Sequence, residues 1–275
     1  DDKIIVDNHA VNGRSSKSFI DEGRWQKVLD KLKPGDYVFI QFGHNDEKPH
    51  ADRHTDPGST FDANLERFVN ETRAKGGIPV LFNSVARRCF YQAPVENDDD
   101  EKLRKTTFAG EEKINSNTLI DTHGAYVVAP RNVARRLNVS FVDATKITHD
   151  IETELGIEGS RKLHMWFRPG ECPQIPKGRQ DNTHYNVYGA RLVANALADE
   201  IGKQVPELKK HVRHYDYVVS TRGRGNYFTL QDAVDAVPAG KRVKVLVLDG
   251  SWKKPENMKG KKIKFILQFG AKITD

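Results

Sequence analysis

The tetrapeptide Asp181-Asn182-Thr183-His184 places an acid three residues before a histidine, directly ahead of the apolar helical pattern of residues 185–201. A carboxylate at that spacing can accept the Nδ1–H hydrogen of the imidazole and fix its tautomer, which leaves Nε2 as a general base for a hydroxyl nucleophile. The same residues could instead cap the helix, with Asp181 or Thr183 as the N-cap and His184 on the surface. The pattern alone leaves both interpretations open.

Two further segments could stabilise the negative charge that such a reaction develops. Asn45 lies in a Gly-His-Asn-Asp sequence after the apolar run of residues 37–42, and Gly13 lies in an Asn-Gly-Arg-Ser sequence after the first apolar run. A side-chain amide and a backbone N–H are the donors that form oxyanion holes, where the loss of one donor lowers the rate by about 10²–10³. Each segment alone is more typical of a turn. The three sites together favour an acyl-transfer reaction.

Short apolar runs alternate with helical patterns over the first part of the chain. We expect strands at residues 4–6, 37–42, 78–82 and 139–142, and helices at 24–32, 61–74, 126–137 and 185–201. Strands buried on both faces and separated by helices predict a parallel sheet with helices on either side, a three-layer α/β domain. Ligands bind at the carboxyl ends of such strands, where Gly13 and Asn45 follow. Residues 91–118 show little periodicity and are expected to form a long loop.

The pattern changes after residue 203. Residues 204–215 are polar and contain Pro206, which is typical of a linker. Beyond them we expect short strands at 217–219, 244–248 and 263–267 and a small helix at 230–237. Because no helix separates the last two strands, the sequence predicts a second domain that begins near residue 216 and does not finish within the chain.

The charge is unevenly distributed. The chain has 275 residues, 44 Lys+Arg against 38 Asp+Glu and a net charge of +6, and residues 216–275 hold twelve basic and six acidic residues. The whole excess therefore lies in this tail, which could bind nucleic acid or an anionic polysaccharide or form a solvated face. No apolar run approaches the ~20 residues of a membrane span, so we expect no membrane association. Cys89 and Cys172 fit no metal spacing and form at most one disulfide.

Several blocks of the sequence resemble the SGNH hydrolases, in particular the rhamnogalacturonan acetylesterase-like carbohydrate esterases. The matching blocks are residues 8–19 (NHAVNGRSSKSF), 42–47 (FGHNDE) and 181–184 (DNTH), with further matches at 87–88, 121–124, 165–166 and 169–170. The resemblance spans residues 1–203, with the blocks in order and at the right intervals. It implies the three-layer, flavodoxin-like fold of that family.

The resemblance also implies roles for individual residues. Gly13 (backbone N–H) and Asn45 (side-chain amide) match two of the three oxyanion-hole donors, His184 matches the base and Asp181 matches its orienting carboxylate. Arg87 and Arg88 are candidates for contacts with uronate carboxylates, although surface solvation is the commoner fate of such pairs. No metal or organic cofactor is implied.

The chain departs from the family at the nucleophile. The Gly-Asp-Ser block that supplies the serine and the third oxyanion N–H is absent, and with it the first strand of the fold. That strand would lie between residues 4–6 and 37–42, so we expect these neighbours to close up or residues 4–6 to detach. No other serine has a Gly-Asp-Ser context; the alternatives are Ser15, Ser16, Ser18 and Ser84. We therefore expect a chain cut at both ends, with little or no esterase activity.

The tail resembles the opening of the pectin methylesterases, where a strand and a short helix cap a right-handed parallel β-helix. The matching residues are 215–219 (YDYVV), 226–237 (NYFTLQDAVDAV) and 243–249 (VKVLVLD). The family usually has a Pro-Gly-x-Tyr turn where this chain has Asp-Gly-Ser-Trp at 249–252. Its catalytic aspartates and arginine lie beyond residue 275, so no site residue can be transferred.

Taken together, these resemblances imply a secreted or periplasmic esterase that removes acetyl groups from pectin and is fused to a pectin methylesterase. Its partner would be acetylated and methylated pectic polysaccharide, not nucleic acid, and we expect a monomer. One alternative is an acetylesterase that acts on xylan or another acetylated glycan. The other is a non-catalytic module that binds polyanions through the remaining cleft or the basic tail.

Overall fold

The computed structural model describes residues 4–92, 103–248, 250–268 and 270–274. Its central sheet consists of three parallel strands in the order β1-β2-β4, with β1 at Tyr37–Gln41, β2 at Ile78–Phe82 and β4 at Ser140–Val142. These are three of the four apolar runs that predict strands, and β2 has the predicted bounds. The side chains of β2, the middle strand, are buried on both faces of the sheet from its second residue on, as is usual for parallel sheets.

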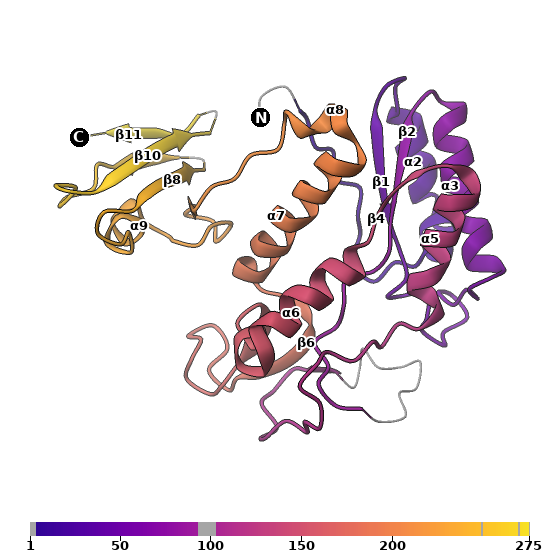
Figure 1. The fold of residues 1–275 in the computed structure, drawn as a ribbon, viewed down its shortest axis with the longest axis horizontal. Helices are drawn as coiled ribbons and strands as arrows, with labels where there is room; N and C mark the ends of the chain where they lie inside the picture. The colour runs from indigo at the N-terminus through magenta and orange to yellow at the C-terminus, as the bar shows by residue number, and fades with distance from the viewer. Residues whose placement is uncertain (1–3, 93–102, 249, 269, 275) are drawn as a thin grey trace.

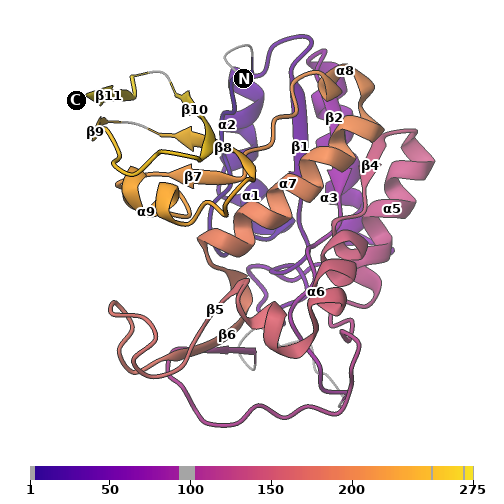
Figure 2. The same ribbon diagram turned by 60° about the vertical axis from the view of Figure 1, so that its left-hand side comes forward.

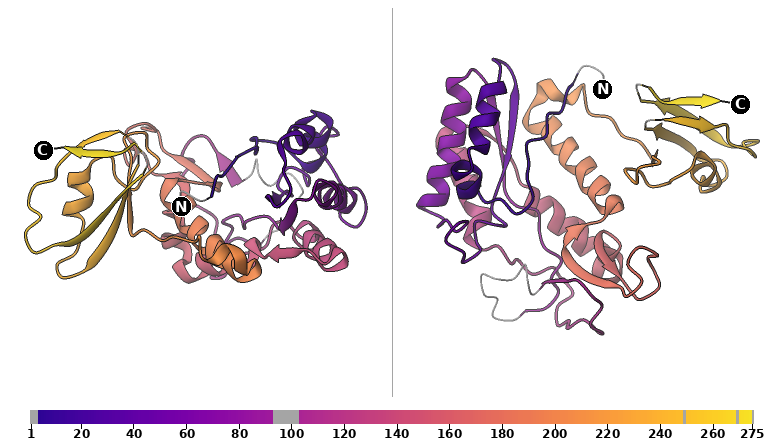
Figure 3. Two further views of the ribbon diagram at one scale, coloured as in Figure 1. Left: turned by 90° about the horizontal axis from the view of Figure 1, so that it is seen from above. Right: turned by 180° about the vertical axis from the view of Figure 1, so that it is seen from behind.

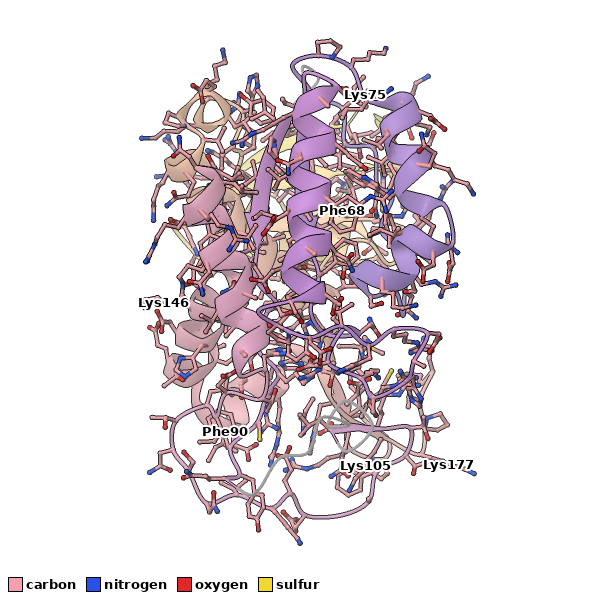
Figure 4. All side chains as sticks on the ribbon, turned by 90° about the vertical axis from the view of Figure 1, so that its right-hand side faces the viewer. Phe68, Lys75, Phe90, Lys105, Lys146 and Lys177 are labelled. Atoms are coloured by element: carbon pink, nitrogen blue, oxygen red, sulfur yellow. The ribbon has the colours of Figure 1, made fainter. Side chains whose placement is uncertain are left out.

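Four helices cover one face of this sheet: α1 at Ser16–Asp21, α2 at Arg24–Lys31, α3 at Thr60–Ala74 and α5 at Ala125–Leu137. Phe61, Leu65 and Phe68 of α3 are fully buried and pack in one cluster with Ile40 of β1 and Leu81 of β2. Figure 4 looks onto this layer, with Phe68 at the middle of α3. The apolar stripe of α3 thus fixes the strands whose ends carry the candidate site.

The opposite face is covered by α6 at Ala144–Arg161, α7 at Val187–Gln204 and the short α8 at Pro206–Lys209. Val80 and Phe82 of β2 and Val142 of β4 pack there against partly buried residues of α6, α7 and α8. The two clusters show that the sheet lies between two layers of helices, as Figure 1 shows. The three-layer α/β prediction is confirmed for this part of the chain.

A separate antiparallel sheet lies beyond the carboxyl end of the parallel sheet (Figure 2). Its main strands are β5 at His164–Phe167 and β6 at Arg179–Tyr185, and the two-residue β3 at Arg104–Lys105 pairs with β6. In Figure 4 Lys105 and Lys177 mark this end of the molecule. The sequence pattern missed this sheet, which carries the Asp181–His184 block.

The tail forms its own small core. The strands β7 at Tyr217–Val219, β8 at Arg242–Val247 and β10 at Lys262–Leu267 are parallel in the order β10-β8-β7, and β9 at Ser251–Lys253 pairs in parallel with β11 at Lys272–Thr274. Helix α9 at Leu230–Asp235 and the inward-facing Val243, Val245 and Val247 share one cluster. Figure 3 shows this unit beside the α/β domain, joined to it by one connecting segment.

Some expectations were wrong in detail. Residues 4–6 form no strand, and Ile5 and Val6 are 93% and 84% exposed, because no described strand pairs with them at the free edge of β1. The expected linker at 204–215 starts at the last residue of α7 and contains helix α8, and Val205 between the two helices is buried in the core. The 18-residue helix α6 was missed, and part of the expected loop at 91–118 lies outside the described residues.

Cys89 and Cys172 are not joined by a disulfide. Among the residues that the structure describes, no helix is both long enough and apolar enough to cross a bilayer.

Candidate active site

The structure brings His184 and Asp181 into direct contact. The Asp181 carboxylate lies 3.0 Å (Oδ2) and 3.2 Å (Oδ1) from Nδ1 of His184. The His184 side chain is 44% exposed, whereas that of Asp181 is 5% exposed. A buried acceptor on Nδ1 favours the tautomer whose Nε2 carries a lone pair. This pair can therefore act as a base toward a hydroxyl group in the solvent-facing space.

Asp181 is held in place by the backbone of its own strand. The N–H groups of Thr183 and His184 each donate to Oδ1 at 3.0 Å. Burial alone would raise the pKa of Asp181, but the hydrogen bonds from the His184 ring and from these two N–H groups outweigh it and hold the pKa below its usual value. The carboxylate is thus charged at neutral pH and can stabilise a protonated imidazole.

This block does not cap a helix, because it lies within strand β6. Helix α7 starts two residues later than the apolar pattern indicates, at Val187, and its N-cap is Asn186, whose side chain accepts from the N–H of Gly189 at 2.9 Å. The capping alternative is therefore wrong. With Asn186 as the cap, the side chains of Asp181 and His184 are left to pair with each other.

Gly13 and Asn45 lie next to each other in space. Gly13 occupies a turn with φ +74°, a left-handed conformation that glycine adopts without strain. The side-chain amide of Asn45 donates to the carbonyl of the residue after Gly13, Arg14, at 3.4 Å. The two proposed oxyanion donors thus share one corner of the molecule. Within the described residues, no hydrogen bond joins them directly to Asp181 or His184.

Asp46 ties these two loops together. Its buried carboxylate accepts hydrogen bonds from the N–H groups of Ser16 (3.0 Å) and Gly43 (3.1 Å) and from the hydroxyls of Ser16 and Thr55. Burial raises the pKa of Asp46 to about 6, and these hydrogen bonds work against that shift. Asp46 therefore fixes the loop that bears Gly13 to the loop that bears Asn45.

The raised pKa of Asp46 predicts a pH dependence of stability. A folded pKa of about 6 lies above the ordinary value of 3.8. The contribution of Asp46 to the free energy of unfolding is therefore fully present below about pH 4 and is lost as the pH rises through 6. The Asp46→Asn variant does not titrate there. We expect the free energy of unfolding of the unmodified chain, measured relative to that variant in urea, to fall by about 2–3 kcal/mol between pH 4 and pH 7. A difference that stays constant over this range would contradict the assignment.

Arg87 connects the Asn45 loop with its surroundings. Its guanidinium forms an ion pair with Glu47 at 2.5 Å and approaches Nδ1 of His123 at 3.1 Å, and His123 in turn lies 3.0 Å from the same Glu47 oxygen. All three side chains are buried. The His123 ring also packs edge-on against the ring of His44, at 4.5 Å between centroids. Through these contacts Glu47, the residue after Asp46, is anchored to the segment that follows β2.

Arg88 makes the corresponding connection to strand β6. Its Nη1 donates to Asn182 Oδ1 at 2.8 Å, and its backbone N–H donates to the Asn182 carbonyl at 2.9 Å. Its Nη1 and Nη2 also donate to Oε1 and Oε2 of Glu112, at 2.5 and 3.1 Å respectively. Its Nε donates to Ser160 Oγ at 3.0 Å. Since Arg87 and Arg88 are consecutive, the pair links the loop of Asn45 to the strand of Asp181 and His184.

This placement changes the interpretation of the two arginines. Arg87 and Arg88 are 2% and 1% exposed, and their guanidinium groups are engaged with Glu47 and Glu112. Groups buried in this way do not face a polysaccharide, so neither the expected uronate contact nor surface solvation fits them. They position the site from within the protein.

The four alternative serines are also buried. Ser15 is the N-cap of α1 and accepts from the N–H of Ser18, whose own hydroxyl lies 3.2 Å from that of Ser15. The hydroxyl of Ser16 donates to Asp46, and that of Ser84 donates to the Phe42 carbonyl at 3.4 Å. Each of the four hydroxyls thus has a structural partner, and the described structure places none of them in a hydrogen bond with His184.

Sequence reasoning did not single out Asp46, Glu47, His123 or Glu112 as part of this site. The first three lie in blocks that match the SGNH family, at 42–47 and 121–124. Glu112 lies in a segment without periodicity, and no signal in the sequence points to it. In the part of the chain that the structure describes, no cluster of His, Cys, Asp and Glu side chains could hold a metal ion.

Known proteins resemble the chain over the same region. Rhamnogalacturonan acetylesterase RhgT of Bacillus subtilis (strain 168) is 36% identical over 209 residues, which cover 76% of this chain and 79% of that protein. The probable rhamnogalacturonan acetylesterase YesY of the same organism is 31% identical over 206 residues, 74% of this chain and 78% of that protein. A rhamnogalacturonan acetylesterase of Emericella nidulans is 29% identical over 203 residues, which cover 70% of this chain and 72% of that protein.

A solved structure supports the fold. The crystal structure of the Bacillus subtilis protein YxiM matches with a TM-score of 0.50 and 21% sequence identity, over 73% of this chain and 46% of that chain. In sequence, residues 2–192 match the GDSL-like lipase/acylhydrolase family, a span that includes the loops of Gly13 and Asn45 and the Asp181–His184 pair. With the α/β fold and the site geometry described above, the chain belongs to the GDSL-like lipase/acylhydrolase family.

Proposed function

We propose that this protein is a carbohydrate esterase that removes acetyl groups from rhamnogalacturonan. The observation that carries the proposal is the Asp181–His184 pair, with Nδ1 of the histidine held by a buried carboxylate and the ring partly exposed. Two relatives more than 30% identical to this chain are named as a rhamnogalacturonan acetylesterase and a probable one, which supports the choice of substrate.

In this mechanism a serine hydroxyl attacks the acetyl carbonyl while Nε2 of His184 takes its proton. The tetrahedral oxyanion is stabilised by the backbone N–H of Gly13 and the amide of Asn45. The imidazolium then gives its proton to the departing sugar oxygen, which leaves an acetyl-serine. Water, activated by the same imidazole, attacks this ester and releases acetate and the free serine.

We further propose that the serine comes from sequence outside these 275 residues. No Gly-Asp-Ser occurs in them, and the outer edge of β1 is unpaired in the described sheet. Phe39 of β1 is 49% exposed, and Ile5 and Val6 are almost fully exposed. A strand that ended in Gly-Asp-Ser and paired with β1 would cover these apolar groups and bring its serine to the carboxyl end of the sheet.

The 275-residue chain should accordingly release acetate from acetylated rhamnogalacturonan no faster than its own His184→Ala variant does. We expect Ser15→Ala to leave this background unchanged, because the Ser15 hydroxyl is buried as a helix cap. Acetate release measured with an enzyme-coupled assay provides the comparison. Robust turnover that Ser15→Ala abolishes would show that the chain carries its own nucleophile.

For the tail, we propose the start of a pectin methylesterase domain. Parallel pairing of β8 with β10 and of β9 with β11 gives two successive turns of chain stacked in register, which supports the beginning of a β-helix. Such a fusion would act on pectin that is both acetylated and methylated, outside the cell or in the periplasm. Sequencing the reading frame beyond residue 275 tests this proposal, because it predicts the family's catalytic aspartates and arginine there.

A further inference from the structure

Four cationic side chains lie in matched register on the tail sheet. Strands β8 and β10 pair in parallel so that Arg242 lies beside Lys262 and Lys244 lies beside Lys264. All four are exposed, whereas Val243 and Val245, which alternate with them along β8, are fully buried. The alternation therefore fixes the four cations on the outer face of the sheet. We refer to these four residues as the basic ladder.

The basic ladder is electrostatically unfavourable in isolation. Neighbouring strands are about 4.8 Å apart, so like charges at paired positions repel each other. Within the described part of the chain, no carboxylate forms an ion pair with any of the four. The adjacent Asp216 carboxylate accepts the backbone N–H of Lys244 at 2.8 Å, and Glu256 lies near Lys253, at 3.9 Å. The repulsion would be relieved by an anion from outside the chain.

We infer that the basic ladder binds a linear polyuronate, a polysaccharide with one carboxylate on each sugar unit. Two rows of cations suit a ligand that presents anionic groups repeatedly along its length. Proteins that bind single-stranded nucleic acid also need aromatic platforms on which bases stack. The four ladder positions are Arg and Lys, and Phe265, the residue after Lys264, packs against the tail core. This composition favours the polysaccharide over nucleic acid.

The choice of a uronate polymer rests on the proposed function, but its test involves no ester hydrolysis. Binding to the basic ladder would keep the enzyme on regions of pectin that have already lost their esters. A failure of the ladder to bind would leave the acetylesterase proposal untouched, and an absence of acetylesterase activity would not affect the binding result.

The experiment uses the full 275-residue chain and polygalacturonate, with binding measured by isothermal titration calorimetry at low and moderate salt. The test variant is Lys244→Gln/Lys264→Gln. The matched control is Lys209→Gln/Lys210→Gln, which removes the same charge from exposed positions at the end of α8. We expect the ladder variant to bind about tenfold more weakly and the control to bind like the unmodified chain. Raising the salt concentration should weaken binding, because counterions compete.

Two further ligands distinguish the possible partners. Fully methyl-esterified pectin has no free uronate carboxylates and should not bind to the ladder. Single-stranded DNA should bind more weakly than polygalacturonate at equal charge concentration. Equal losses in the two double variants would show that only net charge matters, and tighter binding of DNA would assign the ladder to nucleic acid; either result would overturn the inference.

Discussion

In a form of the protein that also carries the proposed Gly-Asp-Ser strand, His184→Ala should lower kcat for acetate release by about 10⁴-fold or more. The reason is that the serine hydroxyl is a poor nucleophile unless a base removes its proton, and removing the base of such a triad abolishes most of the rate enhancement. Asp181→Asn should cost about 10⁴-fold, because its amide cannot hold the same tautomer of His184. KM should change much less than kcat in both variants.

The chain offers a matched control for this prediction. His214 and Asp199 form another His–Asp pair, 2.7 Å apart, with both side chains about half exposed. His214→Ala should leave kcat unchanged. If the two histidine variants lost activity equally, the loss would reflect a general effect on the protein and not the removal of a base.

The second large effect is expected on stability. Arg88→Met should lower the free energy of unfolding by about 3–5 kcal/mol, because it removes the centre of a buried network and leaves Glu112 with less compensation for its charge. The hydrogen bonds to Asn182 Oδ1, Ser160 Oγ and the Ile157 carbonyl are lost with it. Equilibrium unfolding in urea measures the change. We expect no larger loss of stability, because Arg161 still forms an ion pair with Glu112 at 2.9 Å and compensates part of its charge.

Arg67→Met is the control for this change in stability. Arg67 forms an ion pair with Glu71 one helical turn away on the surface of α3, and its side chain is 48% exposed. Pairs of this kind contribute about 0–1 kcal/mol. The loss of stability in Arg88→Lys should lie between those of Arg88→Met and Arg67→Met, since lysine keeps the charge but lacks the planar guanidinium that reaches several partners. A cost below about 1 kcal/mol for Arg88→Met, no more than a surface pair, would show that the network does not hold β6 in place.

The sheet strands and several helices could be predicted because apolar residues determine them. The apolar runs at β1, β2 and β4 and the apolar stripe of α3 give local signals that tertiary packing then confirms. Helix α6 gave a weaker signal because Gly156 interrupts its helical backbone, with φ +66°. Strand β6 could not be recognised because its sequence, RQDNTHY, is almost entirely polar. Its burial depends on hydrogen bonds to distant groups.

The site was predictable where its partners are close in sequence. Asp181 and His184 are three residues apart, and their contact follows from that spacing. Arg87 and Arg88 pair with acids 40 and 24 residues away, so no local pattern reveals whether they are buried or face solvent. The role of Asp46 likewise depends on Ser16, which is 30 residues away. Such groups become visible only when the fold brings the loops together.

Acetate release from acetylated rhamnogalacturonan, with acetylxylan as the competing substrate, is the decisive measurement for the proposed site. A form of the protein that also carries the proposed Gly-Asp-Ser strand would be compared with its own His184→Ala variant and with the 275-residue chain. We expect turnover of acetylated rhamnogalacturonan in preference to acetylxylan by the form with the added strand alone, and loss of this turnover when His184 is replaced. Turnover that survives His184→Ala would contradict the proposed base, and a preference for acetylxylan would contradict the proposed substrate.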